Sequence, residues 1–164
     1  MSPKIVELKS RQVFDSRGFP TVETDVILSD GSKGSSIVPS GASTGSYEAH
    51  ELRDQNNDYL NKSVFKAVEN VNGKINKLLN NMDPFNQEKI DNTLIDLDGS
   101  NNKSNIGANA ILSVSIANCK AAAKSKKKEV YEYLSKNENY KLPYPLMNII
   151  NGGAHANNNL SFQE

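Results

Sequence analysis

The sequence predicts an α+β fold in which a three-stranded antiparallel meander is followed by helices. Two observations carry this prediction. Apolar and polar residues alternate with a period of two from Thr21 to Leu28, as in a strand with one buried face. After Asp58 the apolar residues recur at steps of three and four, which is the period of a helix packed along one side.

The meander is expected between Lys4 and Pro39. Asp30-Gly31 is typical of a tight hairpin turn leading into a strand over Ser35 to Val38, and Gly18 and Pro20 mark the turn before the middle strand. The middle strand alternates between residues expected to face the core and residues expected to face solvent, namely Val22, Thr24, Val26 and Leu28 against Thr21, Glu23, Asp25 and Ile27.

Two helices are expected next. The first carries one apolar stripe, which Gly73 would weaken without ending the helix: Val64, Val68, Val71, Ile75 and Leu78. The second is predicted to begin with Asp83 as its N-cap and Pro84 at its first helical position, and to end at Asp98-Gly99. Its buried face would hold Ile90, Leu94 and Leu97.

A third helix, capped by Ser104 or Asn105 and running to about Lys124, is predicted to be the central one because it is apolar on most sides. Its main face would consist of Ile106, Ala110, Val114, Ala117 and Ala121, with Leu112 and Ile116 on a second face. The lysines at its end suit the negative end of the helix dipole.

The remaining residues indicate a change of architecture. The sequence predicts a short helix over Glu129 to Lys136 and a linker over 137–145. It then predicts new strands at Leu146 to Ile150 and at Ser161 to Glu164. The predicted organisation is therefore an amino-terminal α+β domain over 1–136, a linker over 137–145, and a second unit beginning at 146–164.

Composition excludes several classes of function. Lys plus Arg and Asp plus Glu both number 19, so no basic field is available to drive nucleic-acid or anionic-membrane binding. The single cysteine, Cys119, allows no intrachain disulfide and indicates a reducing compartment. No apolar run approaches the roughly 20 residues of a membrane span. We expect a soluble cytoplasmic protein.

A loop of small residues follows the third strand: Ser40, Gly41, Ala42, Ser43, Thr44 and Gly45. Its glycines would allow backbone groups to approach a phosphate or a metal ion closely. Taken alone, such a loop is more often a flexible connection. It also fails the P-loop pattern, because no lysine follows the second glycine.

A second candidate site lies at the end of the sequence. His155 follows the apolar run Leu146 to Ile150 through a Gly-rich turn, and barrel folds gather active-site groups at the carboxyl ends of their strands. Gln163 and Glu164 end the next expected strand, whereas His50 lies in a polar run and is interpreted as a surface residue.

Several motifs occur together in a fixed order, and together they resemble the amino-terminal region of the enolases over essentially the whole chain. This joint occurrence favours a functional interpretation of the loop and of the residues near the end of the sequence. The motifs are Asp15 to Gly18, Pro20 to Glu23, Pro39 to Gly45, Glu48-Ala49, Glu51 to Asp54, Leu97 to Gly99, Asn102 to Ser104, Gly107 to Leu112 and Met147 to His155. The amino-acid sequence of the last motif resembles bacterial members more than animal members. Phe19 departs from the asparagine usual at its position, which leaves the details of that turn open.

The resemblance implies the fold and the chemistry. Enolases place such a domain before an eight-stranded barrel, so 146–164 would hold the first strands of an incomplete TIM-like barrel. They interconvert 2-phosphoglycerate and phosphoenolpyruvate in glycolysis and gluconeogenesis, which makes them carbon-oxygen lyases, and they use two Mg²⁺ ions. By resemblance, Ser43 would bind the second Mg²⁺ as the loop closes, His155 and Gln163 would contact substrate, and Glu164 would contact substrate and help the acid that protonates the departing hydroxyl.

The resemblance also implies limits. The family's base, its proton-donor glutamate, its principal metal ligands and its phosphate-binding arginine come from later barrel strands, so we predict that the isolated 164-residue chain is inactive. The complete enzyme is expected to be a homodimer in which a residue such as Arg11 or Glu23 meets the partner's barrel. A cytoplasmic location is implied, with secondary display at the cell surface as an option in the family.

Two other interpretations remain open at the level of sequence. One is a non-catalytic amino-terminal module that binds another protein or serves in assembly. The other is a small phosphate-binding protein that uses the loop Ser40 to Gly45, which is disfavoured because the sequence shows no fixed cation beside that loop.

Overall fold

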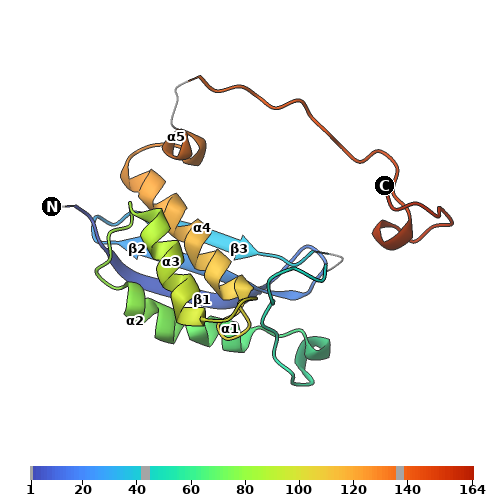
Figure 1. Ribbon diagram of the computed structural model, residues 1–164, viewed down its shortest axis with the longest axis horizontal. Helices are drawn as coiled ribbons and strands as arrows, with labels where there is room; N and C mark the ends of the chain where they lie inside the picture. Colours follow the sequence, from blue (N-terminus) through green and yellow to red (C-terminus); the bar gives the residue numbers. More distant parts are fainter. Residues whose placement is uncertain (1, 42–44, 136–138) are drawn as a thin grey trace.

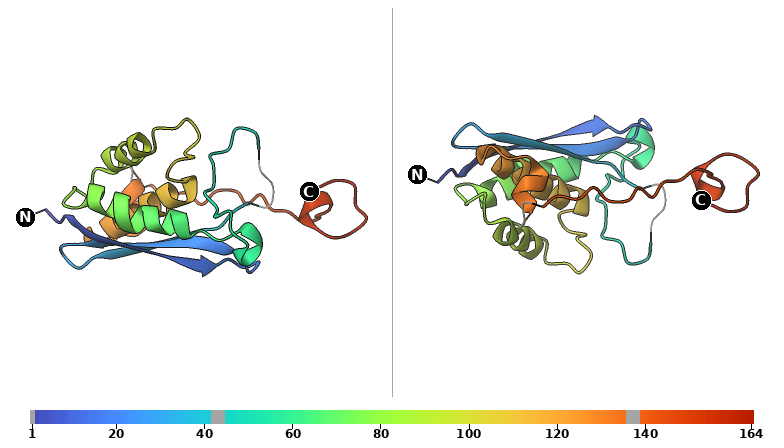
Figure 2. Two further views of the ribbon diagram at one scale, coloured as in Figure 1. Left: turned by 90° about the horizontal axis from the view of Figure 1, so that it is seen from below. Right: turned by 90° about the horizontal axis from the view of Figure 1, so that it is seen from above.

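The computed structural model describes residues 2–41, 45–135 and 139–164, and its body is a three-stranded antiparallel sheet with helices on one face (Figures 1 and 2). The strands are β1 (Ile5–Phe14), β2 (Pro20–Leu28) and β3 (Lys33–Val38), in the order β1-β2-β3. The predicted meander is confirmed, and Gly31 takes the left-handed conformation, with φ 82°, in the turn between β2 and β3.

The core-facing side of β2 is as predicted, because Val22, Val26 and Leu28 are buried in the main hydrophobic cluster. Thr24 joins them through a 2.7 Å hydrogen bond between its hydroxyl and that of Ser113. The prediction that the other side faces solvent is wrong for two residues, since Thr21 and Asp25 are buried. Asp25 is covered by side chains from the neighbouring strands, which pair with its carboxylate.

The first helical stripe forms in three parts: α1 (Phe65–Asn70), a π-helical turn η2 (Val71–Ile75) and α2 (Asn76–Leu79). A short 3₁₀ turn, η1 (Asp58–Asn61), precedes them. A π-turn holds more residues than an α-turn, so the residues after it are rotated about the helix axis and a later residue takes the buried position. The prediction that Leu78 is buried is therefore wrong: Leu79 is fully buried, whereas Leu78 is 40% exposed.

The next two helices begin later than predicted. α3 (Gln87–Asp98) is capped by Asn86, whose side chain accepts a hydrogen bond from the amide of Lys89, whereas Asp83 caps a turn. α4 (Ala108–Ser125) has Gly107 at its N-cap position and no side-chain cap. The amides of Asn105 and Ile106 instead donate to the buried carboxylate of Asp98, which fixes the chain before α4 begins.

The helix α4 is central, as predicted, and packs against β2, β3, α3 and the short helix α5 (Val130–Leu134). Its predicted main face is buried, whereas Leu112 is 47% exposed. The close approach of β3 to α4 depends on Gly34, because a Cβ there would lie 2.2 Å from the carbonyl oxygen of Ala117. In the described part of the chain, no helix is both long and apolar enough to span a membrane.

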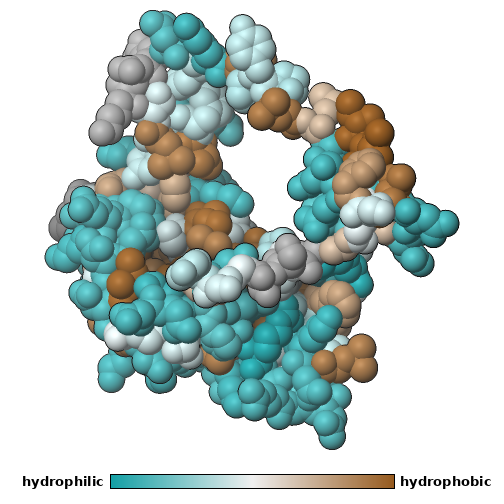
Figure 3. Space-filling view, turned by 45° about the vertical axis from the view of Figure 1, so that its right-hand side comes forward, coloured by the Kyte–Doolittle hydropathy of each residue, from teal (hydrophilic) through white to brown (hydrophobic). Residues whose placement is uncertain are grey.

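Residues 139–164 leave the body of the molecule, at first as an extended chain (Figure 1). Hydrophobic side chains lie exposed along this segment (Figure 3), and those of Leu142 and Leu146 are almost fully exposed. The strands predicted at Leu146 to Ile150 and Ser161 to Glu164 do not form, and within the described residues 139–164 the structure has a single 3₁₀ turn, η3 (Gly153–His155). A strand needs a ladder of backbone partners, and among the described residues Leu146 to Ile150 has none.

Candidate functional site

The loop predicted to bind a metal ion follows β3 through Pro39. Ser40, Gly41 and Gly45 are described, whereas Ala42, Ser43 and Thr44 lie outside the described residues. The predicted role of Ser43 therefore stays a prediction.

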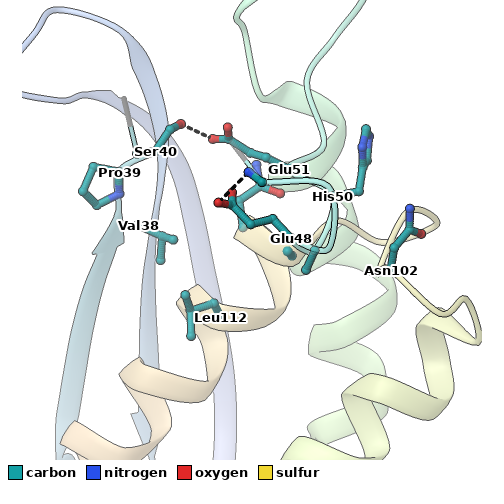
Figure 4. Close-up of a pocket in the computed structure, with 13 residues that line it drawn as sticks. Val38, Pro39, Ser40, Glu48, His50, Glu51, Asn102 and Leu112 are labelled. Atoms are coloured by element: carbon teal, nitrogen blue, oxygen red, sulfur yellow. Dashed lines mark hydrogen bonds between the residues drawn. The ribbon is translucent and has the colours of Figure 1, made fainter. Parts of the chain in front are cut away.

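A pocket of about 550 Å³ opens beside the described ends of this loop (Figure 4). One side comes from Val38 to Gly41, and the other comes from the segment Glu48 to Glu51 and the first residues of α4. Ser40 and Glu51 point toward each other in the close-up, with 2.6 Å between the hydroxyl and a carboxylate oxygen. The pocket is thus polar on the side where the loop begins.

His50 lies on the rim of this pocket and is exposed, as predicted for a surface residue. Its backbone makes the structural contribution. The amide donates to the carbonyl of Asn102 at 2.6 Å, and the carbonyl accepts from the amide of Ala108 at 2.8 Å. His50 therefore helps to attach the segment beside the loop to the start of α4.

Two arginines hold the first residue of the loop. Arg17 donates from Nη2 to the carbonyl oxygen of Ser40 at 2.8 Å, and Arg53 donates from Nη2 to its hydroxyl at 2.7 Å. The expectation that no fixed cation lies beside the loop is wrong. The sequence could not place these cations, because they lie 23 and 13 residues away from Ser40 along the chain.

The predicted site residues near the end of the sequence meet in a compact turn. The amide of Gly152 donates to the carbonyl of Gln163 at 2.9 Å, and that of Gly153 donates to Leu160 at 3.2 Å. This pairing brings His155 Nδ1 to 3.3 Å from Glu164 Oε2.

The surroundings of this pair are open. Relative exposure is 26% for the His155 side chain and 43% for that of Glu164. The side-chain amide of Asn148 donates to the same carboxylate oxygen, whereas Gln163 is exposed. A carboxylate and an imidazole within hydrogen-bonding reach can hold and exchange a proton, which is the function required of general acids and bases.

The structure does not join the two predicted groups. The described ends of the loop, Ser40, Gly41 and Gly45, have no hydrogen bond or ion pair with the turn that carries His155 and Glu164.

The described residues do not by themselves form a magnesium site. Within the ranges 2–41, 45–135 and 139–164, no group of three or more His, Cys, Asp or Glu side chains lies in an arrangement that could hold a metal ion. A Mg²⁺ site needs several oxygen ligands in octahedral geometry. The described part of the chain therefore fits at most a contribution to such a site.

The residues expected at a dimer contact pair with each other. Arg11 Nε lies 2.6 Å from Glu23 Oε2, and Arg11 Nη1 lies 2.9 Å from Asp25 Oδ2. The homodimer stays a prediction.

Sequence reasoning assigned no role to Arg53 or to Asn109. Asn109 is buried and holds the backbone of Leu52 with both ends of its amide, at 3.2 and 3.0 Å. Both residues stand inside motifs that carried the family resemblance. The signal that could have identified them was therefore present, although their contacts depend on the fold.

Comparison with known protein families agrees with this arrangement. The family model for the enolase N-terminal domain matches residues 5–134, which include the sheet, all helices from α1 to α5 and the core. The model for the enolase C-terminal TIM barrel domain matches residues 139–164, which include His155 and Glu164. The first match covers well over half of the 164 residues. The chain belongs to the enolase family.

Proposed function

We propose that this chain supplies the amino-terminal domain and the first part of the active site of an enzyme that interconverts 2-phosphoglycerate and phosphoenolpyruvate. The observation that carries the proposal is the contact between His155 and Glu164, because it joins two family-predicted site residues. The removal of a hydroxyl group requires a proton donor beside it, and a carboxyl group within hydrogen-bonding reach of an imidazole is suited to assist that donor.

The roles of individual residues follow the family. Glu164 would assist protonation of the departing hydroxyl, His155 would lie against the phosphate and leaving-group side, and Gln163 would contact substrate. Ser43 would contribute oxygen ligands to one of two Mg²⁺ ions. In the family, bound Mg²⁺ stabilises the negative charge that develops when a proton is removed beside a carboxylate.

The 164 residues by themselves are proposed to be inactive. The family places its base, its proton-donor glutamate, its principal metal ligands and its phosphate-binding arginine in later barrel strands. Loss of groups that act together can remove nearly the whole rate enhancement.

The test compares the chain alone with the chain joined after Glu164 to the rest of a barrel from a complete enolase. Phosphoenolpyruvate formation from 2-phosphoglycerate is followed by ultraviolet absorbance, with and without Mg²⁺. We expect turnover from the joined protein only. A folded joined protein without turnover would contradict the proposed function, and turnover by the chain alone would contradict its proposed inactivity.

One observation favours a non-catalytic module as the second candidate. Among the described residues, the members of the hydrophobic core lie between Ile5 and Ala121, so the domain builds this core without the segment that carries His155 and Glu164. This interpretation predicts a folded chain that binds a protein partner without dependence on Mg²⁺. A joined protein that folds but lacks activity would favour it.

A further inference from the structure

The guanidinium group of Arg53 lies where four segments of the chain meet. Its Nη1 donates to the carbonyl of Pro20 at 2.7 Å and to that of Lys62, and its Nη2 donates at 2.7 Å to both the Ser40 hydroxyl and Glu51 Oε1. The side chain is only 20% exposed. A positive charge that is partly removed from water needs hydrogen-bond acceptors in the protein, and these four oxygen atoms supply them.

The acceptor Ser40 is the first residue of the small-residue loop. Its hydroxyl also donates to Glu51 Oε1 at 2.6 Å, and its carbonyl accepts from Arg17. The start of the loop is therefore fixed through both its side chain and its backbone.

The end of the loop is fixed from the same stretch of sequence. The amide of Gly45 donates to Glu48 Oε1 at 2.9 Å, and the amide of Glu48 donates to the carbonyl of Gly45 at 3.2 Å (Figure 4). Residues 48–53 thus contact the loop at its first and its last position.

Residues 48–53 are themselves attached to the start of α4. The carbonyl of His50 accepts from Ala108, and the amide group of Asn109 holds Leu52 in both directions. Gly107 allows this close contact, because a Cβ there would lie 2.5 Å from Leu52 Cβ. Hydrogen bonds thus attach the segment to the start of the central helix.

We propose that residues 48–53 form a brace that fixes Ser40 and Gly45, the described ends of the small-residue loop, and that Arg53 is the positioning residue at its core. Arg53 acts through Ser40 and does not touch the reacting atoms. The catalytic consequence rests on the proposed function, whereas the structural role does not.

Arginine is required here by its shape. A planar guanidinium presents five N–H donors in a fixed fork and reaches acceptors on two sides, whereas a lysine ammonium is a single point charge on a flexible stem. Arg53→Lys keeps the charge but cannot hold Pro20, Lys62, Ser40 and Glu51 together. Ser40→Ala removes one acceptor and leaves the other three in place.

The structural part is tested on the 164-residue chain by NMR relaxation. We expect the backbone order parameter of Ser40 to fall from about 0.85, typical of rigid backbone, to below about 0.6 in Arg53→Lys, with a smaller fall in Ser40→Ala. Lys77→Met, an exposed charge change in α2, is the control and should leave Ser40 unchanged. Unaltered order at Ser40 in both brace variants would overturn the inference. If Arg53→Lys does not fold, Ser40→Ala decides alone.

The catalytic part is tested in the joined protein, in which the chain continues after Glu164 into a complete barrel. We expect Arg53→Lys to lower kcat by at least about tenfold with KM changed less than about threefold, since misplacement of a reacting group lowers the rate more than it lowers binding. Arg53→Lys and Ser40→Ala should be non-additive, because one acts through the other. Additive effects, or equal losses with Lys77→Met, would contradict the brace. An inactive wild-type joined protein would count against the proposed function alone, and the NMR result would still decide the brace.

Discussion

At the scale of single residues, the carboxylate of Asp25 shows how charge is buried on the sheet. Lys33 Nζ lies 2.8 Å and Arg11 Nη1 2.9 Å from Asp25 Oδ2, and the Ser35 hydroxyl donates to the other oxygen. Burial alone would raise the pKa of Asp25, but the bonds from Lys33, Ser35 and Arg11 outweigh it and lower the pKa to about 2.

This shift makes stability depend on acidity. The pKa of Asp25 is lower in the folded chain than its unfolded value of about 3.9, so its stabilisation is complete above that value and is lost as the pH falls toward about 2. We expect Asp25→Asn to lower the free energy of unfolding at pH 7 by about 2 kcal/mol and to flatten its dependence on pH between about 4 and 2. Urea unfolding at several pH values measures both.

The matched control is Asp96→Asn, at an exposed position of α3, which should change the free energy of unfolding at pH 7 by less than about 0.5 kcal/mol. An Asp25→Asn variant that loses stability in acid as steeply as the wild type would show that Asp25 is not the responsible group.

Gly34 lies where β3 comes close to the backbone of α4. A Cβ at Gly34 would lie 2.2 Å from the carbonyl oxygen of Ala117 and 2.3 Å from the amide nitrogen of Ala121, both of which are backbone atoms of α4. We expect Gly34→Ala to destabilise the fold by about 3 kcal/mol or more, since β3 and α4 must move apart. Thermal unfolding followed by circular dichroism measures the loss.

Gly73→Ala provides the comparison, because nothing lies within 4 Å of the position that a Cβ would take there and the φ of Gly73 is not left-handed. We expect it to be neutral or to stabilise by up to about 1 kcal/mol through the better helix propensity of alanine. Equal losses at Gly34 and Gly73 would contradict the close approach of β3 and α4.

At the scale of elements, the π-turn η2 decides which leucine of α2 enters the core. Leu79 is fully buried and Leu78 is 40% exposed, the reverse of the order that a regular helix would give. We expect Leu79→Ala to cost about 2 to 5 kcal/mol and Leu78→Ala to cost less than about 1 kcal/mol in urea unfolding. A larger loss at Leu78 would mean that the helix runs without the π-turn.

The elements show what periodicity can predict and what it cannot. The meander, the four helical stretches and most core positions follow from hydrophobic period, because burial of one face dominates their stability. The phase beyond Val71 depends on the π-turn η2, and the starts of α3 and α4 depend on individual hydrogen bonds. Before α4, for example, the carboxylate of Asp98 accepts from the amides of Asn105 and Ile106. The side-chain cap expected from Ser104 or Asn105 is absent.

At the scale of the whole molecule, the candidate site is divided between the folded domain and the segment that leaves it. The domain supplies the loop ends and the pocket of Figure 4, and the segment supplies His155 and Glu164. The sequence motifs predict candidate site residues. They could not identify Arg17 and Arg53 as the groups that hold Ser40, because the contacts of these arginines arise only when distant segments fold together.

The same limit applies to the expected barrel strands. Their apolar pattern is present in the sequence, but a strand exists only with partners, and Leu146 and Ile149 stay exposed among the described residues. The family match at 139–164 accounts for the pattern, since barrel strands are apolar because they are buried in the complete barrel.

The participation of Glu164 in the reaction is tested by measuring the rate of phosphoenolpyruvate formation by the joined protein and by its Glu164→Gln variant. The substitution keeps the size of the side chain and removes its ability to take up and release a proton. We predict a loss in kcat of about 100-fold or more, as for other general acid and base groups, while Asn157→Ala, at an exposed position of the same turn, retains activity. An unchanged rate in Glu164→Gln would contradict the assignment of Glu164 to the active site.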